Sequence, residues 1–508
     1  MGSISIFSNY VDWSNIGENS KMVLNTDEDY PQMGLNSNEN KFSVNKNNTK
    51  KILFVLLLGG FMSMLSETAL SIVFPHIMLQ YNISAGTVQW LTTIYVLVSG
   101  IVFLISAFLI ERFSTRKLFM YSMVFLIIGT IVSGISSNFP VLFTGRVIQA
   151  VGTGILVPLI FNTILILIPR QKQGLVMGLV SLVILSAPMF APVFMGFLIG
   201  FMDWHWFFLL VLVFFIATSV LGISFLRNVT EVTRPKLDIL SVILAAVGFG
   251  GIIMGFSALG DYGLSLNVML PLIIGIVSLI LFAARQLTME HPLLDLHVFN
   301  YPFFTIGIII NVINVMVVFA IVIILPMYLQ NGIGTTSFVA SLVMLPGSIL
   351  NCLLPLLAGH IYDRHGPRVI VSSGLAIMCI SMIFLSNLSV STTLAAVLII
   401  NCGLYIGSAL LMSPNQTNTL GNLDSKHYAS GSAIMTSLQQ MGGAIGSSLF
   451  VSFMSFGQHS YLQNIINPDP AQQISALISG VNFSFLIGAI ILAFVFVLSL
   501  FLKKEAHA

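Results

Sequence analysis

The sequence predicts an all-α integral membrane protein with fourteen transmembrane helices. Of its 508 residues, 56% are hydrophobic and only 7% are charged, whereas a soluble domain carries about 25% charged residues. A soluble protein of this composition could not cover its apolar side chains with polar surface. From Lys50 onward, apolar runs of about 20 residues recur, and a helix of that length spans the hydrocarbon layer. Since lipid offers the backbone no hydrogen bonds, each run is predicted to be helical.

The predicted helices follow a polar N-terminal segment. Residues 1–49 are rich in Asn and Ser and show no periodicity, which indicates a disordered cytoplasmic tail. The spans are expected near 52–75, 88–110, 118–136, 141–166, 175–200, 205–226, 238–259, 268–287, 302–329, 338–358, 369–387, 393–413, 430–455 and 480–502. Residues 504–508 form a short C-terminal tail.

The positive residues give the orientation, because Lys and Arg concentrate in cytoplasmic loops. With the N-terminus inside, all but one of the 20 Lys and Arg residues fall on the inner side or at inner helix ends. The exception, Arg146, lies within the fourth span. A wrong number of spans would scatter positive residues on both sides, so we expect fourteen spans with both termini in the cytoplasm.

A coarse repeat predicts two related halves. The loop after the second span reads "ERFSTRK" (111–117), and the loop after the tenth reads "YDRHGPR" (362–368). This indicates six-helix halves at 50–228 and 301–503, with two inserted helices and a linker at 229–300. Repeated halves are typical of secondary transporters, whose substrate site lies near the bilayer midplane between them.

Several other functions are disfavoured by what the sequence lacks. No GxxxxGK[ST] phosphate loop occurs, which argues against an ATP-driven motor and for an ion gradient as the energy source. An intramembrane enzyme would need a cluster such as metal-ligating His, but no span holds two His at ligand spacing. The three cysteines lie in apolar runs and resemble small core residues. We therefore expect no catalytic residues, metal or cofactor, no nucleic-acid partner, and a monomer in the lipid bilayer.

Glu67, in "SETALSIVFP" (66–75), is the only acidic residue deep within a span. A charge at the centre of a transmembrane helix costs about 2.5–3.5 kcal/mol on insertion scales. Because desolvation disfavours the ionised carboxylate, Glu67 could hold a proton in a dry state and release it to water in a wet one. The alternative is a neutral structural Glu bonded to a neighbouring helix.

Arg146, in "FTGRVIQAVGTG" (143–154), is the only basic residue inside a span. It cannot deprotonate, so it needs a carboxylate, backbone carbonyls or water as a partner. Gln149 lies on the same helix face. We interpret Arg146 as part of the coupling machinery, with a structural ion clamp as the alternative; the sequence leaves open whether it meets Glu67.

Further polar residues and prolines within the spans are candidates for a cavity or a moving helix. Two such prolines, Pro188 and Pro192, lie four residues apart in the fifth span and should kink it on one face. The polar candidates for a substrate cavity are Gln89, Thr93, Gln149, Asn311, Asn314, Gln439 and Gln440. Each of them also has an ordinary structural interpretation, as a helix-to-helix hydrogen bond or part of an interfacial belt.

Several motifs together resemble the fourteen-span drug:proton antiporter family of the major facilitator superfamily, over residues 50–503. These are "SETALSIVFP", "QWLTTIY" (89–95), "RVIQAVGTG" (146–154), "APMFAPVFMG" (187–196) and "GHIYDRHGPR" (359–368). In the span-five motif, Ala191 and Met195 stand where the family has glycine, while Gly196 is retained. The stretch "ISAFLIERFSTRKLF" (105–119) most resembles the lincomycin-resistance type of exporter of Gram-positive bacteria.

The resemblance implies the major facilitator fold and export of amphiphilic drugs or antibiotics in exchange for protons, by alternating access in a bacterial cell membrane. It implies that Glu67 and Arg146 serve proton coupling and that the span-five motif favours export. It also implies gating roles for residues of the two related loops, namely Glu111, Arg112, Asp363, Arg364 and Arg368. The second hypothesis is a proton-coupled transporter of one cellular metabolite, such as a peptide, bile acid or sugar derivative. The third is a non-transporting membrane sensor.

Overall fold

The computed structural model describes residues 46–502, apart from 169, 227, 229–237, 264, 290–291, 425–426, 464 and 466–467. Both predicted tails, 1–49 and 504–508, therefore lie wholly or almost wholly outside the described residues. The described chain consists of helices joined by short turns, and none of its residues lies in a strand. Twelve stretches of this part are helical, long and apolar enough to cross a membrane. The protein is thus an all-helical, multi-pass membrane protein.

The elements follow the predicted spans closely. They are α2 (Lys46–Thr68), η2 (Ala69–Val73), α3 (Phe74–Tyr81), α4 (Ala85–Val88), α5 (Trp90–Leu104), α6 (Ser106–Arg112), α7 (Thr115–Gly134), α8 (Phe139–Leu167), α9 (Arg170–Ile199), α10 (His205–Phe225), α11 (Ile239–Tyr262), α12 (Leu266–Thr288), η3 (Leu296–Asn300), α13 (Pro302–Met327), η4 (Tyr328–Gly332), α14 (Ser337–Leu385), α15 (Leu394–Gly421), α16 (Tyr428–Leu462) and α17 (Pro470–Ser499). Two helices outside the twelve apolar stretches, α9 and α16, coincide with the predicted spans 175–200 and 430–455.

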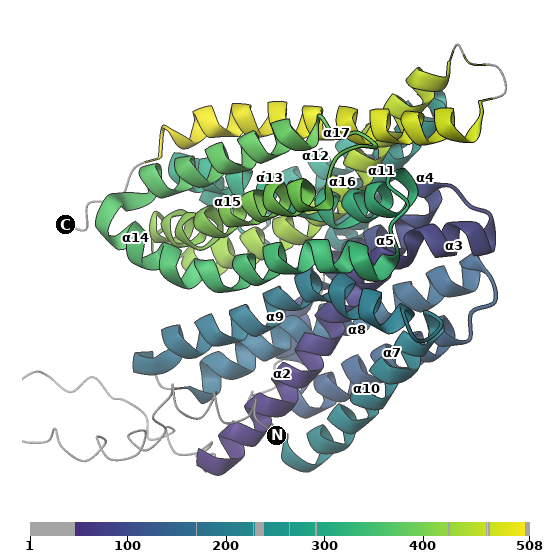
Figure 1. Ribbon diagram of the computed structural model, residues 1–508. Coiled ribbons are helices and arrows are strands. Elements are labelled where there is room, and N and C mark those ends of the chain that lie inside the picture. Colours follow the sequence, from purple (N-terminus) through teal and green to yellow (C-terminus); the bar gives the residue numbers. More distant parts are fainter. Residues whose placement is uncertain are drawn as a thin grey trace, which may run out of the picture. The chain divides into compact units, whose positions relative to one another are not determined.

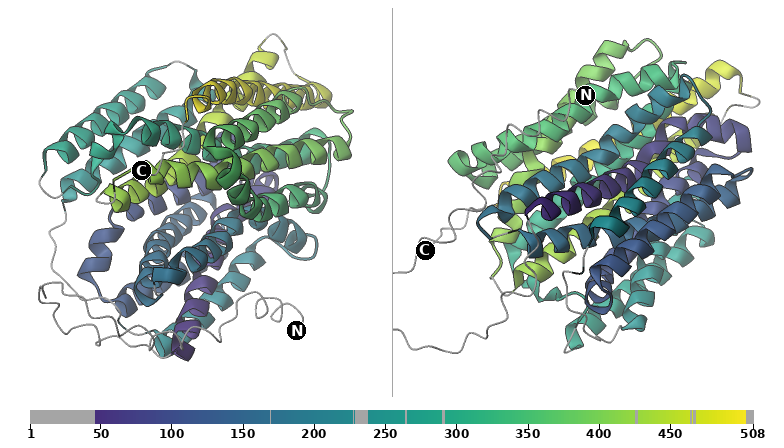
Figure 2. Two further views of the ribbon diagram at one scale, coloured as in Figure 1. Left: turned by 90° about the vertical axis from the view of Figure 1, so that its left-hand side faces the viewer. Right: turned by 90° about the horizontal axis from the view of Figure 1, so that it is seen from below.

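The helices pack in two groups. In the first, α2 contacts α8, α9 and α10, while α7 packs on α8 and α10. In the second, α13 contacts α15 and α16, while α14 packs on α15 and α17. Between them, α5 meets α16 and α9 meets α14, and α11 packs against α16 and α12 (Figures 1 and 2). The groups diverge towards the end of the bundle where α2 begins, as Figure 1 shows.

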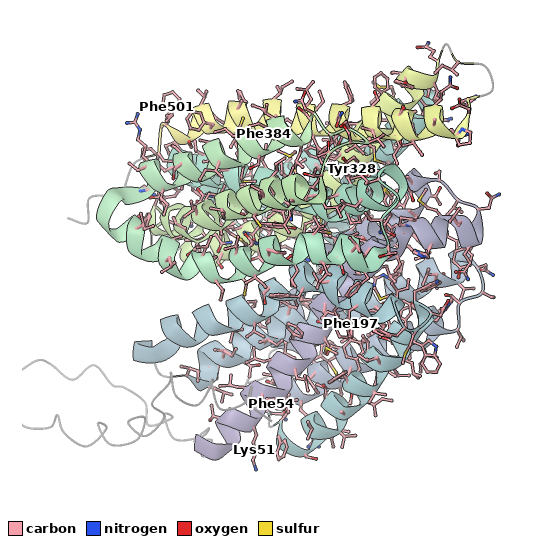
Figure 3. The ribbon with its side chains drawn as sticks, viewed as in Figure 1. Lys51, Phe54, Phe197, Tyr328, Phe384 and Phe501 are labelled. Atoms are coloured by element: carbon pink, nitrogen blue, oxygen red, sulfur yellow. The ribbon has the colours of Figure 1, made fainter. Side chains whose placement is uncertain are left out.

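Apolar side chains cover the surface of the helix bundle as well as its interior. Phe54 is 60% exposed, and Phe384 and Phe501 are exposed to a similar degree (Figure 3). Tyr328, by contrast, is fully buried. Large exposed aromatic rings on many helices suit contact with lipid tails and would make a soluble protein aggregate.

One predicted loop is shorter than expected. The sequence predicts a loop at 359–368 between two spans, whereas α14 consists of two helices that meet at a sharp break at Gly366. Gly366 has a φ of 77°, which glycine adopts readily because it has no Cβ. Pro367 follows directly and begins the second helix. Asp363 and Arg364 are thus helical residues at the end of the first segment, and the connection between the segments is almost immediate.

The first predicted span, 52–75, is broken near its outer end. The α-helix ends at Thr68, and a 3₁₀ turn, η2, leads into α3. Pro75 lies at the start of α3 and has no N–H to continue an α-helical ladder. The break leaves the last carbonyl groups of α2 without partners inside their own helix, at the position of Glu67.

Candidate functional site

Glu67 lies in the last turn of α2 and is completely buried. Neither carboxyl oxygen has a hydrogen-bond partner among the described residues. A buried charge is costly, so burial disfavours the ionised form, whereas the nearby Arg146 guanidinium and Gln440 amide favour it. The residue nevertheless belongs to the lining of a cavity.

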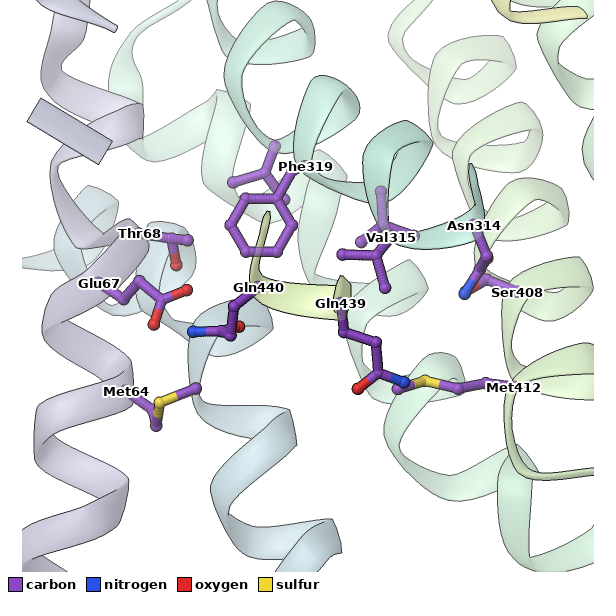
Figure 4. A pocket seen from close by; sticks show the side chains of 12 residues that line it. Met64, Glu67, Thr68, Asn314, Val315, Phe319, Ser408, Met412, Gln439 and Gln440 are labelled. Carbon is purple, nitrogen blue, oxygen red and sulfur yellow. The ribbon is translucent and has the colours of Figure 1, made fainter. Parts of the chain in front are cut away.

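The cavity lies between the two groups of helices. It is partly open, with about 660 Å³ of non-atom space when the open solvent at its mouth is included, and it is lined by residues of α2, α13, α15 and α16. The lining residues are Met64, Glu67, Thr68, Asn314, Val315, Val318, Phe319, Val322, Ser408, Met412, Gln439 and Gln440. Figure 4 shows Glu67 on one wall, Phe319 and Val315 in the middle, and Asn314, Ser408 and Met412 on the opposite wall. A mostly apolar lining with a few polar groups is typical of a site for a small organic molecule.

Arg146, on α8, meets the backbone of Glu67 and not its carboxyl group. One terminal guanidinium nitrogen donates to the Glu67 carbonyl oxygen at 2.6 Å, and the other donates to the Ser66 carbonyl at 2.8 Å. These are the carbonyl groups that the end of α2 leaves free. The guanidinium therefore serves as a cap for the broken helix, which answers the question that the sequence left open.

The remaining contacts of Arg146 complete its coordination. Its Nε donates to the Leu91 carbonyl of α5 at 3.1 Å, and a terminal nitrogen also reaches the Gln149 side-chain oxygen at 3.1 Å. The amide nitrogen of Gln149 donates to the Thr130 hydroxyl of α7 at 2.8 Å. The ring of Tyr95 lies 4.2 Å from the guanidinium carbon, in cation–π geometry. One buried cation thus ties α2, α5, α7 and α8 together.

Of the polar residues predicted for a cavity, three line it. These are Asn314, Gln439 and Gln440. Asn311 lies directly behind, where its side-chain oxygen accepts from Gln439 at 2.8 Å. Gln440 donates to the Ser99 hydroxyl of α5 at 3.4 Å and so bridges the two groups.

The other three polar candidates lie outside this lining. Gln149 belongs to the Arg146 network described above. Gln89 donates to Ser257 of α11 at 3.0 Å, and its oxygen accepts from Thr93. The Thr93 hydroxyl is 2.6 Å from that of Ser447 on α16. Gln89 and Thr93 therefore join α5, α11 and α16 in this conformation.

The residues of the two loop motifs lie at helix ends, and those of the span-five motif lie at a helix interface. Glu111 and Arg112 are exposed at the end of α6, and Arg368 is exposed just after the Gly366 turn. The side chains of Asp363, Arg364 and Pro188 lie outside the described ones. Ala191, Pro192 and Gly196 are buried residues of α9. A Cβ on Gly196 would lie 2.4 Å from Cβ of Ser341, so this position allows α9 to pack closely on α14.

Sequence reasoning missed the polar wall contributed by α15. Ser408 lines the cavity, and Tyr405 and Asn401 precede it by three and seven residues, on the same helix face. The signal was present as polar residues at helical spacing in "NCGLYIGS" (401–408). It was weak because hydroxyl groups in transmembrane helices often bond only their own backbone.

Comparison with known proteins bears on the fold and on the family. Residues 56–447 match the Major Facilitator Superfamily. The lincomycin resistance protein LmrB of Bacillus subtilis is 43% identical over 457 residues, covering 89% of this chain and 95% of that protein. Its counterpart in Listeria innocua is 42% identical over 454 residues, covering 89% and 96%. A crystal structure of a bacterial homologue of the human lysosomal transporter Spinster, inward-facing and unoccupied, superposes with a TM-score of 0.65 at 15% identity, over 92% of this chain and 100% of that one.

Proposed function

The chain belongs to the major facilitator superfamily, and from that premise we propose that it exports small amphiphilic drugs or antibiotics in exchange for protons. It is accordingly a transporter and not an enzyme. The names of its relatives as lincomycin resistance proteins support an antibiotic as the substrate. The superfamily gives the fold, the names of the relatives support the substrate class, and the geometry of the site supports the proposed mechanism.

One observation carries the proposal: a fully buried carboxyl group without a hydrogen-bond partner forms part of the wall of a cavity. Such a group is stable when protonated and gains most from water or a cation when it ionises. A substrate and a proton can therefore compete for Glu67. Release of the proton to one side and uptake from the other couples the two flows.

The energetics are sufficient for a useful gradient. A positive charge that moves inward yields about 2.3 kcal/mol per 100 mV. A tenfold concentration ratio of a neutral compound requires about 1.4 kcal/mol. One net charge per cycle therefore supports more than tenfold outward pumping, with no cofactor.

We propose that transport proceeds by alternating access between the two groups of helices. Contacts between the groups gather near one end, where Gln330 donates to the Ile72 carbonyl at 2.7 Å and Phe197 lies 6.3 Å from Phe338. The distribution of Lys and Arg makes this the outer end, with both termini in the cytoplasm. We further propose fourteen spans, in which α9 and α16 complete the two halves and α11 and α12 are the inserted pair.

The proposal is tested in proteoliposomes with an imposed pH gradient, using lincomycin and chemically different amphiphiles. We expect Glu67→Gln to reduce pH-driven accumulation by at least tenfold and to retain exchange of labelled for unlabelled substrate, which needs no net proton movement. Normal pH-driven transport by this variant would remove Glu67 from the mechanism. Transport of a single metabolite, with no response to the amphiphiles, would favour the second hypothesis.

A further inference from the structure

We propose that Asn314 of α13 and Ser408 of α15 form a hydrogen-bonding subsite for an uncharged hydroxyl or amide group of the transported compound, on the cavity wall opposite Glu67. The inference rests on the proposed function for the existence of a substrate, and it specifies the chemistry of that substrate. Neither residue serves the proton step. Their role is to determine which amphiphiles are accepted.

The first observation is that both side chains carry polar atoms without partners. Asn314 is 1% exposed and its side-chain oxygen has no hydrogen-bond partner among the described residues. Ser408 is completely buried, and its hydroxyl group likewise has none. The great majority of buried side-chain polar atoms in proteins are paired, so two unpaired atoms in one lining indicate a place that a ligand or water fills.

The second observation is their position. Both residues belong to the cavity lining, and Figure 4 places them together on the wall away from Glu67. Asn401 and Tyr405, further along the same face of α15, also have buried polar atoms without partners. The unpaired groups therefore continue beyond the cavity along α15, whereas the neighbouring amide of Gln439 is already occupied by Asn311.

The chemistry of the two walls defines the ligand. The carboxyl group of Glu67 lies at one end of the site, and the amide group of Asn314 and the hydroxyl group of Ser408 lie at the other. Between them lie Val315, Val318 and Phe319. The complementary molecule has a basic or proton-exchanging group at one end, an apolar middle, and a hydroxyl or amide group at the other end.

The test compares two probes on the full-length protein in lipid nanodiscs. Lincomycin carries a basic amine, an amide and several hydroxyl groups, whereas tetraphenylphosphonium is an amphiphilic cation that forms no hydrogen bonds. We expect Ser408→Ala and Asn314→Leu each to weaken lincomycin binding by about 2- to 10-fold, the range for one hydrogen bond. Tetraphenylphosphonium binding should stay within twofold of wild type. Ser408→Thr keeps a hydroxyl group and should restore lincomycin binding.

Three results would overturn the subsite. In the first, Ser408→Ala binds lincomycin with the affinity of wild type. In the second, Ser408→Ala and Ser408→Thr lose lincomycin affinity equally. In the third, the affinities for both probes fall in parallel, which indicates a general distortion of the cavity wall. A wild-type protein that binds tetraphenylphosphonium but not lincomycin would also overturn it, and would leave export of amphiphilic cations intact. Selective loss of lincomycin binding without any pH-driven transport in the wild type would support the subsite and contradict proton coupling, so the two failures are distinguishable.

Discussion

The buried polar groups around Arg146 and those on the cavity wall of α13 and α15 differ in one respect. At Arg146, the guanidinium group donates to three backbone carbonyls and to Gln149, and Gln149 in turn donates to Thr130. On the cavity wall, Asn314 and Ser408 are just as buried and have polar atoms without partners. Both regions lie inside the same bundle, so burial alone does not distinguish them.

The presence or absence of hydrogen-bond partners indicates which buried polar groups are structural. A fully paired group stabilises one arrangement of its helices, and its removal leaves several partners unsatisfied. An unpaired group contributes little to the fold and remains available to a ligand, a proton or water. We therefore propose that Arg146 belongs to the framework that holds Glu67, and that the cavity wall serves substrate recognition.

The largest effect should come from breaking the paired region. Arg146→Met leaves the carbonyls of Ser66, Glu67 and Leu91 without their donor. We expect the free energy of unfolding to fall by roughly 2–5 kcal/mol, given the cost of breaking a buried charged network and the smaller values typical of membrane hydrogen bonds. Thermal unfolding in detergent measures it. An Arg146→Met protein as stable as wild type would show that the network is dispensable.

The second-largest loss of stability is expected at a close contact between α7 and α8 in the same region. A Cβ on Gly129 of α7 would lie 2.5 Å from the backbone nitrogen of Gln149 on α8. Gly129→Ala should therefore destabilise the protein by about 1–3 kcal/mol through overpacking. The matched control is Gly250→Ala on α11, where nothing lies within 4 Å of the added Cβ. Its thermal midpoint should be unchanged or slightly raised; equal losses in both variants would contradict the argument.

An ion pair at the ends of α11 and α12 offers a third case, because its two groups are paired but partly exposed. Asp238, next to α11, accepts from Nε of Arg285 at 2.7 Å and from a terminal nitrogen at 2.9 Å. Hydrogen bonding from Arg285 lowers the pKa of Asp238 to about 2. Since this is below the unfolded value of about 3.9, the pair stabilises the fold above that value and loses its contribution as the pH falls towards 2.

We expect Asp238→Asn to cost about 1 kcal/mol or less at pH 7, because the Arg285 side chain is 38% exposed and solvent screens the pair. Thermal midpoints of wild type and variant should converge between about pH 4 and pH 2. A difference that stays constant over this interval would mean that the pair is not its source.

The smallest change in stability is expected among the buried polar groups that have no hydrogen-bond partner. Asn401 is completely buried, and both polar atoms of its amide group have no partner among the described residues. Replacing an unpaired polar group by an apolar one of similar shape is nearly neutral or stabilising. Asn401→Leu should thus change the free energy of unfolding by less than about 1 kcal/mol, in either direction. A loss as large as that of Arg146→Met would erase the distinction between the regions.

Most of the fold could be predicted from the sequence, because a helix that spans lipid needs an apolar run of fixed length. The runs locate the helices to within a few residues, apart from the first span, the ends of α15, α16 and α17 and the segment 359–368. There the helices extend beyond the hydrocarbon thickness, and Gly366 turns the chain within a single residue. Hydropathy cannot detect such a turn, since it reports transfer to lipid and not backbone geometry.

The candidate site was predictable in part. Glu67 and Arg146 stood out because charge is costly in lipid, but their relation was not readable from sequence. It depends on the helix break after Thr68, which leaves the carbonyl groups of Ser66 and Glu67 available to accept hydrogen bonds from Arg146. Gln89 and Thr93 looked like cavity residues by composition, yet they pair with Ser257 and Ser447 from distant parts of the chain. Only the packing of the helices decides which polar groups find partners.

The cap that Arg146 places on α2 has a mechanical consequence. Since a single cation fastens the end of this helix to α5 and α8, we expect the backbone at Glu67 to move together with these helices. In the proposed transport cycle, the quantity that varies is then the distance between the carboxyl group of Glu67 and the amide groups on the opposite wall of the cavity. Narrowing it would squeeze water out and return the proton, and widening it would admit water and let the proton go.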